Sequence, residues 1–257
     1  MSLTLDQVKS KSSKRLIGLH PVVLAAATAL IEHCFARGVP ILITQGLRTI
    51  AEQDVLYAQG RTKPGSIVTN AKGGYSYHNF GLAVDFALLL PNGSSVSWDM
   101  NRDYNGNNIK DWIEVVEEAK KLGFEWGGDW KTFKDYPHFQ MAFGLTLTQL
   151  RAGSKPTETA MAKATAIINR LKEEVKEDMS RIEELEAIVV KQDERLEAVE
   201  KRLNISGKET YASNYTEAIT AAKAAGAITT SADKSKIELN IIQMFFNLGL
   251  FQEREDK

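Results

Sequence analysis

The first 150 residues mix helical and extended patterns of hydrophobic positions. Apolar residues at helical spacing predict a helix over 20–38, and the segments 49–59 and 109–122 follow the same periodicity. A β-branched run at 39–44 predicts a buried strand after the first of these helices. Strands and helices do not alternate strictly, so we expect an α+β fold built on a small mixed or antiparallel sheet. The expected apolar face of the helix at 49–59 consists of Ala51, Val55, Leu56 and Tyr57.

The pattern changes after residue 152, and it divides the chain into four expected parts. These are a first domain at 1–152, a linker at 153–158, a coiled coil at 159–206 and a small all-α C-terminal domain at 207–257. The last part contains two short helices that would each expose too much apolar surface in isolation, so we expect them to pair, dimerise or dock. A helix-turn-helix DNA-binding unit is a weak alternative, because this part has few basic residues.

The predicted coiled coil depends on a seven-residue repeat. Polar Asp178 and Gln192 fall at core position d, where they weaken the seam and are able to set register or partner number. The alternative is a helix that folds back onto the first domain. The apolar residues at position a are Met161, Ile168, Val175, Ile182, Val189, Leu196 and Leu203. Charged residues that flank the seam are Lys172, Glu174, Arg181, Glu186, Arg195 and Glu200.

Composition excludes several classes of protein. The 257 residues are 43% hydrophobic and 25% charged, which is ordinary for a soluble chain that buries a core. The net charge of −1 gives no overall field that favours nucleic acid or an anionic membrane. The single cysteine, Cys34, excludes an internal disulfide framework. Neither a signal-peptide pattern nor a membrane-spanning apolar run is found, so we expect a protein held in the cytoplasm until something releases it.

Two short stretches carry the candidate chemistry. His78 and Asp85 lie in the first, seven positions apart, with Gly81 between them to let the backbone turn. His138 lies in the second, and Asp135 precedes it by three residues. A catalytic zinc takes three protein ligands and keeps a fourth position for water, so these two histidines and Asp85 meet the count. The alternative is that each polar residue is satisfied separately in a turn or at a strand end.

These motifs resemble a known family of zinc peptidases. The pattern Ser-x-His-x-x-Gly-x-Ala-x-Asp at 76–85, followed by Asp-x-Pro-His at 135–138, is similar to the LAS group of lysostaphin-type and D-Ala-D-Ala peptidases. The segments 56–65 and 68–71 resemble the L-alanyl-D-glutamate endopeptidase branch, in peptidase family M15, found in phage endolysins and some bacilli. The resemblance covers roughly residues 1–150. It implies one zinc ion per chain and cleavage of peptidoglycan stem peptides.

The resemblance also implies roles for two further residues. Asp135 is expected to act as general base and acid, although many LAS enzymes have the longer glutamate there. Its alternative role is to cap the turn at Tyr136-Pro137. Arg48 is expected to hold the substrate or the oxyanion, and the alternative is an ion pair with Glu52 one turn further on.

Four residues are candidates for substrate binding. Ser76 is placed to bond the substrate backbone, and Arg61 and Lys63 are placed to pair the D-glutamate carboxylate. Trp130 is expected to wall the cleft. Each has an ordinary alternative: a turn-closing serine, solvated loop charges and a buried aromatic ring.

The motifs favour a phage endolysin that waits in the host cytoplasm and cuts the L-Ala–D-Glu bond of the wall after release. In this hypothesis peptidoglycan is the partner, and the coiled coil and tail supply homo-oligomerisation and wall attachment. The first alternative is a D-Ala-D-Ala carboxypeptidase or dipeptidase. The second is a virion module that binds the wall without catalysis.

Overall fold

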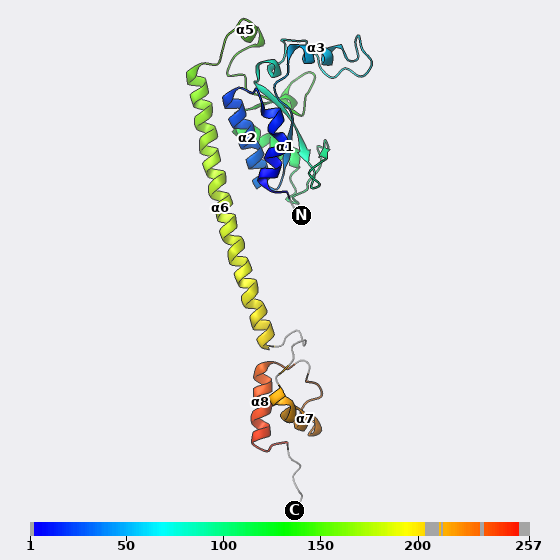
Figure 1. The fold of residues 1–257 in the computed structure, drawn as a ribbon, viewed down its shortest axis with the longest axis vertical. Helices are drawn as coiled ribbons and strands as arrows, with labels where there is room; N and C mark the ends of the chain where they lie inside the picture. Colours follow the sequence, from blue (N-terminus) through cyan, green and yellow to red (C-terminus); the bar gives the residue numbers. More distant parts are fainter. Residues whose placement is uncertain (1–2, 204–210, 212, 232–233, 252–257) are drawn as a thin grey trace, which may run out of the picture. The chain divides into compact units, whose positions relative to one another are not determined.

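The computed structural model describes the backbone of residues 3–203, 211, 213–231 and 234–251. The chain forms two compact units, Met1–Met179 and Ser180–Lys257, which are described separately here. Figure 1 colours the chain from its N-terminus to its C-terminus and labels most of the helices.

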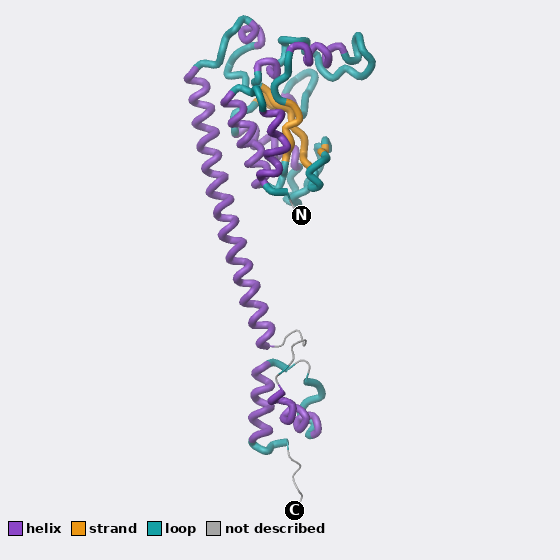
Figure 2. The backbone as a smooth tube through the Cα atoms, in the orientation of Figure 1, coloured by secondary structure: helices purple, strands orange, loops and turns teal. Residues whose placement is uncertain are grey.

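A small antiparallel sheet organises the first unit. Its strands are β1 (Ile41–Gln45), β2 (Ala83–Leu89), β3 (Val96–Ser97), β4 (Glu125–Trp126) and β5 (His138–Gln140). They pair in the order β1-β2-β5-β4, with β3 beside β2, and every pairing is antiparallel. Helices lie beside the strands (Figure 2), so the predicted α+β class is confirmed. Strand β2 therefore lies at the centre and connects the two halves of the sheet.

Helices bury the sheet from the outside. Helix α1 (Leu5–Leu16) packs on β1 and on α2 (Pro21–Ala36), and α2 packs on α4 (Asp111–Lys121). The predicted helices at 20–38 and 109–122 are thus confirmed within two residues at most ends. The centre of the core is aromatic: Phe86 of β2 lies 4.5 Å from Trp112 and 5.0 Å from Phe139, measured between ring centroids. These contacts hold β2 and β5 against α4.

Helix α3 (Ile50–Ala58) has the predicted position but not the predicted face. Its only buried residue is Gln53, while Val55 is 55% exposed. The expected apolar face of this helix was therefore wrong. A capping box between Thr49 and Glu52 begins the helix, so local hydrogen bonds rather than apolar burial define its start.

Helix α6 (Glu158–Leu203) follows the short helix α5 (Leu147–Arg151). Its first turns pack on the first unit: Met161, Ala164, Ile168 and Leu171 contact the core, and Ile168 is 1% exposed. The alternative of a helix that folds back onto the first domain therefore describes this part of α6. From Arg181 to Lys201 every side chain is exposed, and the coiled coil stays a prediction there.

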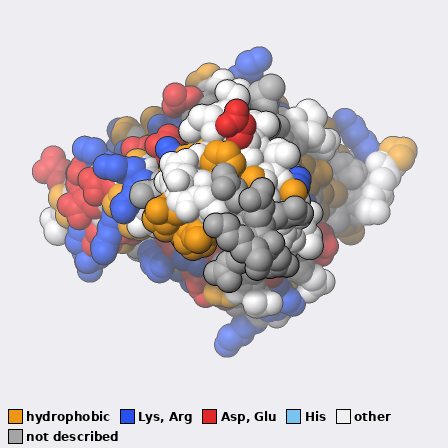
Figure 3. Space-filling view, turned by 90° about the horizontal axis from the view of Figure 1, so that it is seen from below, with side chains coloured by type: hydrophobic (Ala, Val, Ile, Leu, Met, Phe, Trp, Pro, Cys, Tyr) orange, Lys and Arg blue, Asp and Glu red, His pale blue; other side chains and the backbone are white. Residues whose placement is uncertain are grey.

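The second unit contains two further helices, α7 (Thr216–Ala224) and α8 (Lys236–Asn247), after the short turn η3 (Ser213–Tyr215). They pack on each other through Ala218, Ala222 and Ile242. Figure 3 shows hydrophobic side chains gathered on the face it views. The expected helix end at 207 and the side chain of Leu203 lie outside the described residues. Exposed large hydrophobic residues of α8 and the turn after it are Ile237, Ile241, Met244, Phe245, Leu248 and Leu250.

No helix in the described part of the chain is long and apolar enough to span a bilayer.

Candidate active site

A tight turn places the first histidine beside the central strand. The turn η1 (Tyr77–Phe80) begins at Ser76, whose Oγ accepts a hydrogen bond from the His78 N–H at 3.4 Å. It ends at Gly81, which has φ +66°; a Cβ there would lie 2.7 Å from the Gly18 carbonyl oxygen. Both the left-handed conformation and this close approach require glycine. The turn leaves His78 2% exposed, directly before β2.

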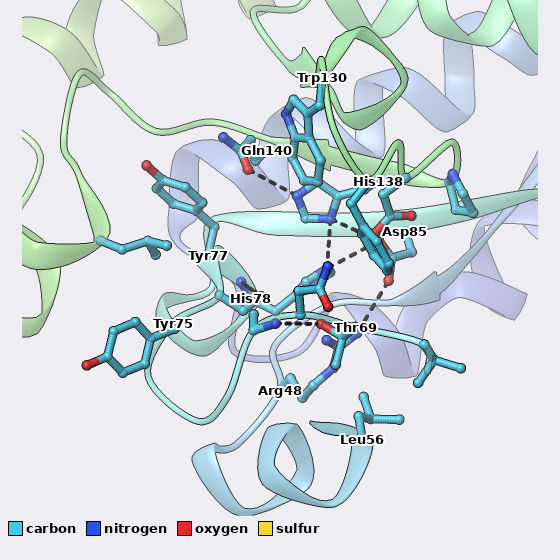
Figure 4. A pocket seen from close by; sticks show the side chains of 18 of the residues that line it. Arg48, Leu56, Thr69, Tyr75, Tyr77, His78, Asp85, Trp130, His138 and Gln140 are labelled. Atoms are coloured by element: carbon cyan, nitrogen blue, oxygen red, sulfur yellow. Dashed lines mark hydrogen bonds and ion pairs between the residues drawn. The ribbon is translucent and has the colours of Figure 1, made fainter. Parts of the chain in front are cut away.

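Three ligand-type atoms form a nearly equilateral triangle. Nε2 of His78 lies 3.2 Å from Oδ1 of Asp85 and 3.1 Å from Nδ1 of His138, and the third side is 3.2 Å. The pairing of Asp85 with His138 across β2 and β5 sets one side of this triangle. In Figure 4 the two rings and the carboxylate point toward one another. A tetrahedral ion with bonds of about 2.0–2.1 Å separates its ligand atoms by about 3.3 Å, so the triangle fits zinc.

The hydrogen bonds behind the two imidazoles assign their tautomers. Nδ1 of His78 lies 2.8 Å from the Gly46 carbonyl oxygen, which only accepts, so Nδ1 carries the proton and Nε2 offers a lone pair. Gln140 Nε2 donates to Glu125 at 2.8 Å, which turns its Oε1 toward Nε2 of His138 at 3.1 Å. His138 therefore donates from Nε2 and offers a lone pair at Nδ1. Two lone pairs and a carboxylate converge on one point, an arrangement that a cation stabilises.

Within the described part of the chain, this is the cluster of His, Cys, Asp and Glu side chains that is able to hold a metal ion. Sequence reasoning found its three residues but missed Gln140 and Glu125. Their signal was weak, because a glutamine two residues after a strand histidine has many structural uses.

The charges at the site perturb two carboxyl groups in opposite directions. Burial acts to raise the pKa of Asp85, but His78 and His138 outweigh it and hold that pKa well below its ordinary value. Burial raises the pKa of Asp135, and the negative charge of Asp85 raises it further. Asp135 lines the cleft beside the triangle. It is therefore the carboxyl group at this site that most readily holds a proton.

Arg48 reaches the site from the segment between β1 and α3, two residues before the helix begins. Its Nη2 lies 3.4 Å from Oδ2 of Asp85, and its Nη1 donates to Oε1 of Gln53 at 2.8 Å. Its Nε is buried and has no hydrogen-bond partner among the described residues. The alternative of an Arg48–Glu52 ion pair is not found, because Glu52 bonds Thr49 in the capping box.

Gln53 is the third residue that sequence reasoning missed. Its Oε1 accepts from Arg48, and its Nε2 donates to the Ala71 carbonyl oxygen at 2.7 Å. Gln53 is fully buried, so the amide holds the arginine and the loop at 68–71 in one arrangement. A polar residue on an apparently apolar helix was the available signal.

A cleft of about 850 Å³ is lined by Arg48, His78, Asp85, Asp135 and His138. The predicted Ser76 and Trp130 both line it, and the Trp130 ring lies 5.2 Å from that of His138. Further lining residues are Val68, Thr69, Asn70, Ala71, Tyr75, Trp98 and Phe133. The triangle of ligand-type atoms therefore lies within a cleft whose volume is typical of ligand-binding sites.

Arg61 and Lys63 are not among the lining residues of this cleft. Arg61 donates to the carbonyl oxygens of Tyr57 and Thr69 and to Oδ1 of Asn70, and its guanidinium lies over the Tyr57 ring. These bonds make it a brace for the loop that forms one wall. Lys63 is exposed and pairs through its backbone with Gly60. Their contact with the substrate stays a prediction.

Comparison with known proteins agrees with this site. Residues 69–141, which include the whole triangle, match a peptidase M15 family model described as D-alanyl-D-alanine carboxypeptidase. The chain is 59% identical over 123 residues to the peptidoglycan L-alanyl-D-glutamate endopeptidase CwlK of Bacillus subtilis (strain 168), covering 48% of this chain and 73% of that protein. It is 34% identical over 148 residues to the L-alanyl-D-glutamate peptidase of Listeria phage A118, covering 57% of this chain and 47% of that protein.

A solved structure is also similar. The L-Ala D-Glu endopeptidase ChiX of Serratia marcescens is 27% identical, with a TM-score of 0.39, and the match covers 52% of this chain and 89% of that one. Fold and site together define a metallopeptidase built on a small antiparallel sheet. The chain belongs to peptidase family M15, as the resemblance of its motifs implied.

Proposed function

We propose that this protein is a zinc-dependent endopeptidase that cleaves the L-Ala–D-Glu bond of peptidoglycan stem peptides, as a phage endolysin does. The observation that carries the proposal is the triangle of His78, Asp85 and His138, with both imidazole lone pairs turned inward at the base of a cleft. The names of two similar proteins, one from Bacillus subtilis and one from a Listeria phage, support the choice of bond.

The three triangle residues would hold one zinc ion. When bound, zinc supplies a Lewis acid and a water molecule whose pKa is lowered toward neutrality. Gly46 and Gln140 fix the two imidazole rings, so the chain presents its ligands without having to rearrange.

Asp135 is the proposed general base and acid. Because burial and Asp85 raise its pKa, the Asp135 carboxylate accepts a proton more readily than one with an ordinary pKa. The proton that it then holds lies at the site for transfer to the leaving amine. Arg48 is the proposed partner for the negative charge that develops on the scissile carbonyl oxygen. Its guanidinium is held by Gln53 and Asp85, so it needs little reorganisation during the reaction.

The cleft walls are the proposed binding surface for the peptide. Ser76 and the loop at 68–71 offer polar groups along one wall, and Trp130 forms part of the other side beside His138. Polar groups that fix orientation and aromatic rings that bury carbon atoms are the usual division of such a site.

A D-Ala-D-Ala carboxypeptidase is the competing enzyme function, because the matching family model carries that description. The full set of ligands and Asp135 count against a wall-binding module without catalysis. Digestion of purified peptidoglycan distinguishes the three. We expect bound zinc and new N-terminal D-glutamate from the wild type, with both lost in His138→Ala.

Asp135→Asn is the matched variant for this experiment, and it should retain zinc while it loses most of its activity. Release of D-alanine alone would replace the endopeptidase assignment with the carboxypeptidase. A zinc-free protein that cuts nothing would favour the wall-binding module.

We propose further that the enzyme reaches the wall from the host cytoplasm after the membrane is opened, as the likeness to a phage protein suggests. The exposed part of α6 would join copies of the chain, and the C-terminal helices would serve oligomerisation or wall attachment. Production inside a host should cause lysis only when a membrane-opening agent is added. Lysis without such an agent would contradict this route.

A further inference from the structure

In the part of the second unit that the structure describes, no side chains pack over the apolar stripe of α6. The residues at the core positions of its seven-residue repeat are largely exposed: Ile182 47%, Leu185 55%, Val189 55%, Leu196 57% and Val199 49%. Toward the N-terminal end of α6, equivalent positions are covered by the first unit, where Ile168 is 1% exposed. A stripe that is buried in one part and bare in the next requires a separate partner for the bare part.

Charged residues along the stripe are sorted by sign. Position g directly precedes each position a. It is basic before Ile182 and before Leu196, where it holds Arg181 and Arg195. The flanking positions e are all acidic, Glu186, Asp193 and Glu200. Within the described residues, none of these five side chains forms an ion pair, so each is available to a partner.

This sorting discriminates between two ways of pairing α6 with itself. In a parallel coiled coil, position g of one helix lies beside position e of the other, five residues further along. Arg181 would then face Glu186, and Arg195 would face Glu200, each pair occurring twice by symmetry. In an antiparallel coiled coil, g faces g and e faces e, which would place arginine against arginine and acid against acid. A second copy of the chain therefore fits this surface only in the parallel direction.

Two polar core positions set the register. Gln192 lies at d between apolar layers, and only an in-register parallel pair places it opposite the second copy's Gln192, where two amides bond each other. Asp178 also lies at d, and there an in-register pair would oppose two carboxylates. The seam accordingly begins after Asp178. This is the point at which packing on the first unit has ended.

We infer that α6 joins two copies of the chain as a parallel, in-register, two-stranded coiled coil over residues 180–201. The inference rests on the proposed self-association of α6 and gives it a direction, a register and a partner number. In the first part of the seam, β-branched Ile182 and Val189 at position a, with Leu185 at d, favour two strands over three or four, whereas Leu196 at a and Val199 at d do not add to this preference. Two catalytic units on one stalk would bind neighbouring peptides of a polymer and stay longer on the wall.

Charge-reversal pairs of the full-length chain test the inference by light scattering after size exclusion. The wild type should have the mass of a dimer. Arg181→Glu with Arg195→Glu, and separately Glu186→Arg with Glu200→Arg, should each be monomeric, and an equal mixture of the two should recover the dimer mass. Reversal of Glu184 and Lys191, which lie at position c outside the seam, is the matched control and should leave the dimer intact.

A cysteine placed in the seam tests direction and register. Gln192→Cys should form a disulfide-linked dimer on mild oxidation, because the two positions face each other only in the parallel, in-register pair. Lys191→Cys should not, and the native Cys34 is buried and so does not interfere. A monomeric wild type, dimers that persist in both reversal variants, or a dimer that Gln192→Cys does not crosslink would each overturn the inference.

Cleavage of a soluble stem peptide separates this result from the proposed function. The residues changed here are remote in sequence from the cleft, so each variant should cut the peptide at the wild-type rate. If a variant loses the dimer but cuts the peptide at the full rate, the result bears only on the coiled coil. If the wild type does not cut the peptide, the result bears only on the peptidase assignment.

Discussion

Replacement of Gln140 by leucine should weaken zinc binding without unfolding the protein. Gln140 is 7% exposed, and its Oε1 accepts from Nε2 of His138 at 3.1 Å. In Gln140→Leu with metal bound, that N–H would be buried without an acceptor, at a cost of about 1–3 kcal/mol. The metal-free variant avoids this cost, because the ring proton moves to Nδ1 of His138. That N–H then donates to Oδ1 of Asp85, 3.2 Å away.

The difference between the two states sets the expected magnitude. Because only the metal-bound state keeps the unpaired N–H, the cost appears as lost affinity. Outer-shell substitutions typically cost 10–100-fold in metal affinity, or about 1.4–2.8 kcal/mol. This range agrees with the cost of one unpaired donor. We therefore expect zinc to bind about 10–100-fold more weakly in Gln140→Leu.

Competition with a coloured chelator measures the zinc affinity, and thermal unfolding in EDTA measures the metal-free fold. Glu125→Gln is the matched control, because its side-chain oxygen still accepts from Gln140 Nε2; we expect a loss of about threefold at most. A folded Gln140→Leu that binds zinc within about twofold of the wild type would refute the tautomer argument. Equal weakening in both variants would show that packing, not the hydrogen bond to His138, is responsible.

Three further predictions concern the arginine, the core and the response to acid. Gln53→Leu removes the acceptor of the Arg48 guanidinium, so kcat/KM on a stem peptide should fall about tenfold, while zinc content stays unchanged; equal kcat/KM would show that Arg48 needs no support. Phe86→Ala should lower the free energy of unfolding by about 3–5 kcal/mol in denaturant titrations, because the ring is fully buried; a loss below about 1 kcal/mol would contradict the packing. The hydrogen bond from His33, with nearby cations, lowers the pKa of Glu118 from 4.5 to about 2 despite burial. The folded-state pKa lies below the ordinary value, so this stabilisation of up to about 3 kcal/mol is present above pH 4.5 and is lost as pH falls toward 2. In Glu118→Gln, the free energy of unfolding should depend less on pH over this range. A pH dependence equal to that of the wild type would contradict this role of Glu118.

Local patterns in the sequence were sufficient for most of the helices and strands and for the metal triangle. Helical spacing and a β-branched run are properties of neighbouring residues, so 20–38, 39–44 and 109–122 could be assigned without knowledge of the fold. His78 and Asp85 lie in one short motif whose glycine makes the turn, a second motif offered His138 as the third ligand, and the resemblance to a known family supported the set. Periodicity alone did not show that these residues meet.

The contacts that prepare the site were decided by tertiary structure. Gly46, Gln53 and Gln140 act through partners that are distant in sequence or on another strand, and nothing in their local pattern marks those partners. Arg61 illustrates the same limit, since its hydrogen bonds to the carbonyl oxygens of Tyr57 and Thr69 depend on how the loop folds and have no mark in the local sequence.

Helix α6 shows where the two kinds of information divide. Its repeat predicts an apolar stripe along the whole helix, but which surface covers each part depends on what lies beside it in space. Within the first unit the core covers Ile168, whereas within the second unit Ile182 and Leu185 are exposed. A sequence determines which side chains avoid water, whereas the three-dimensional packing determines what they meet instead.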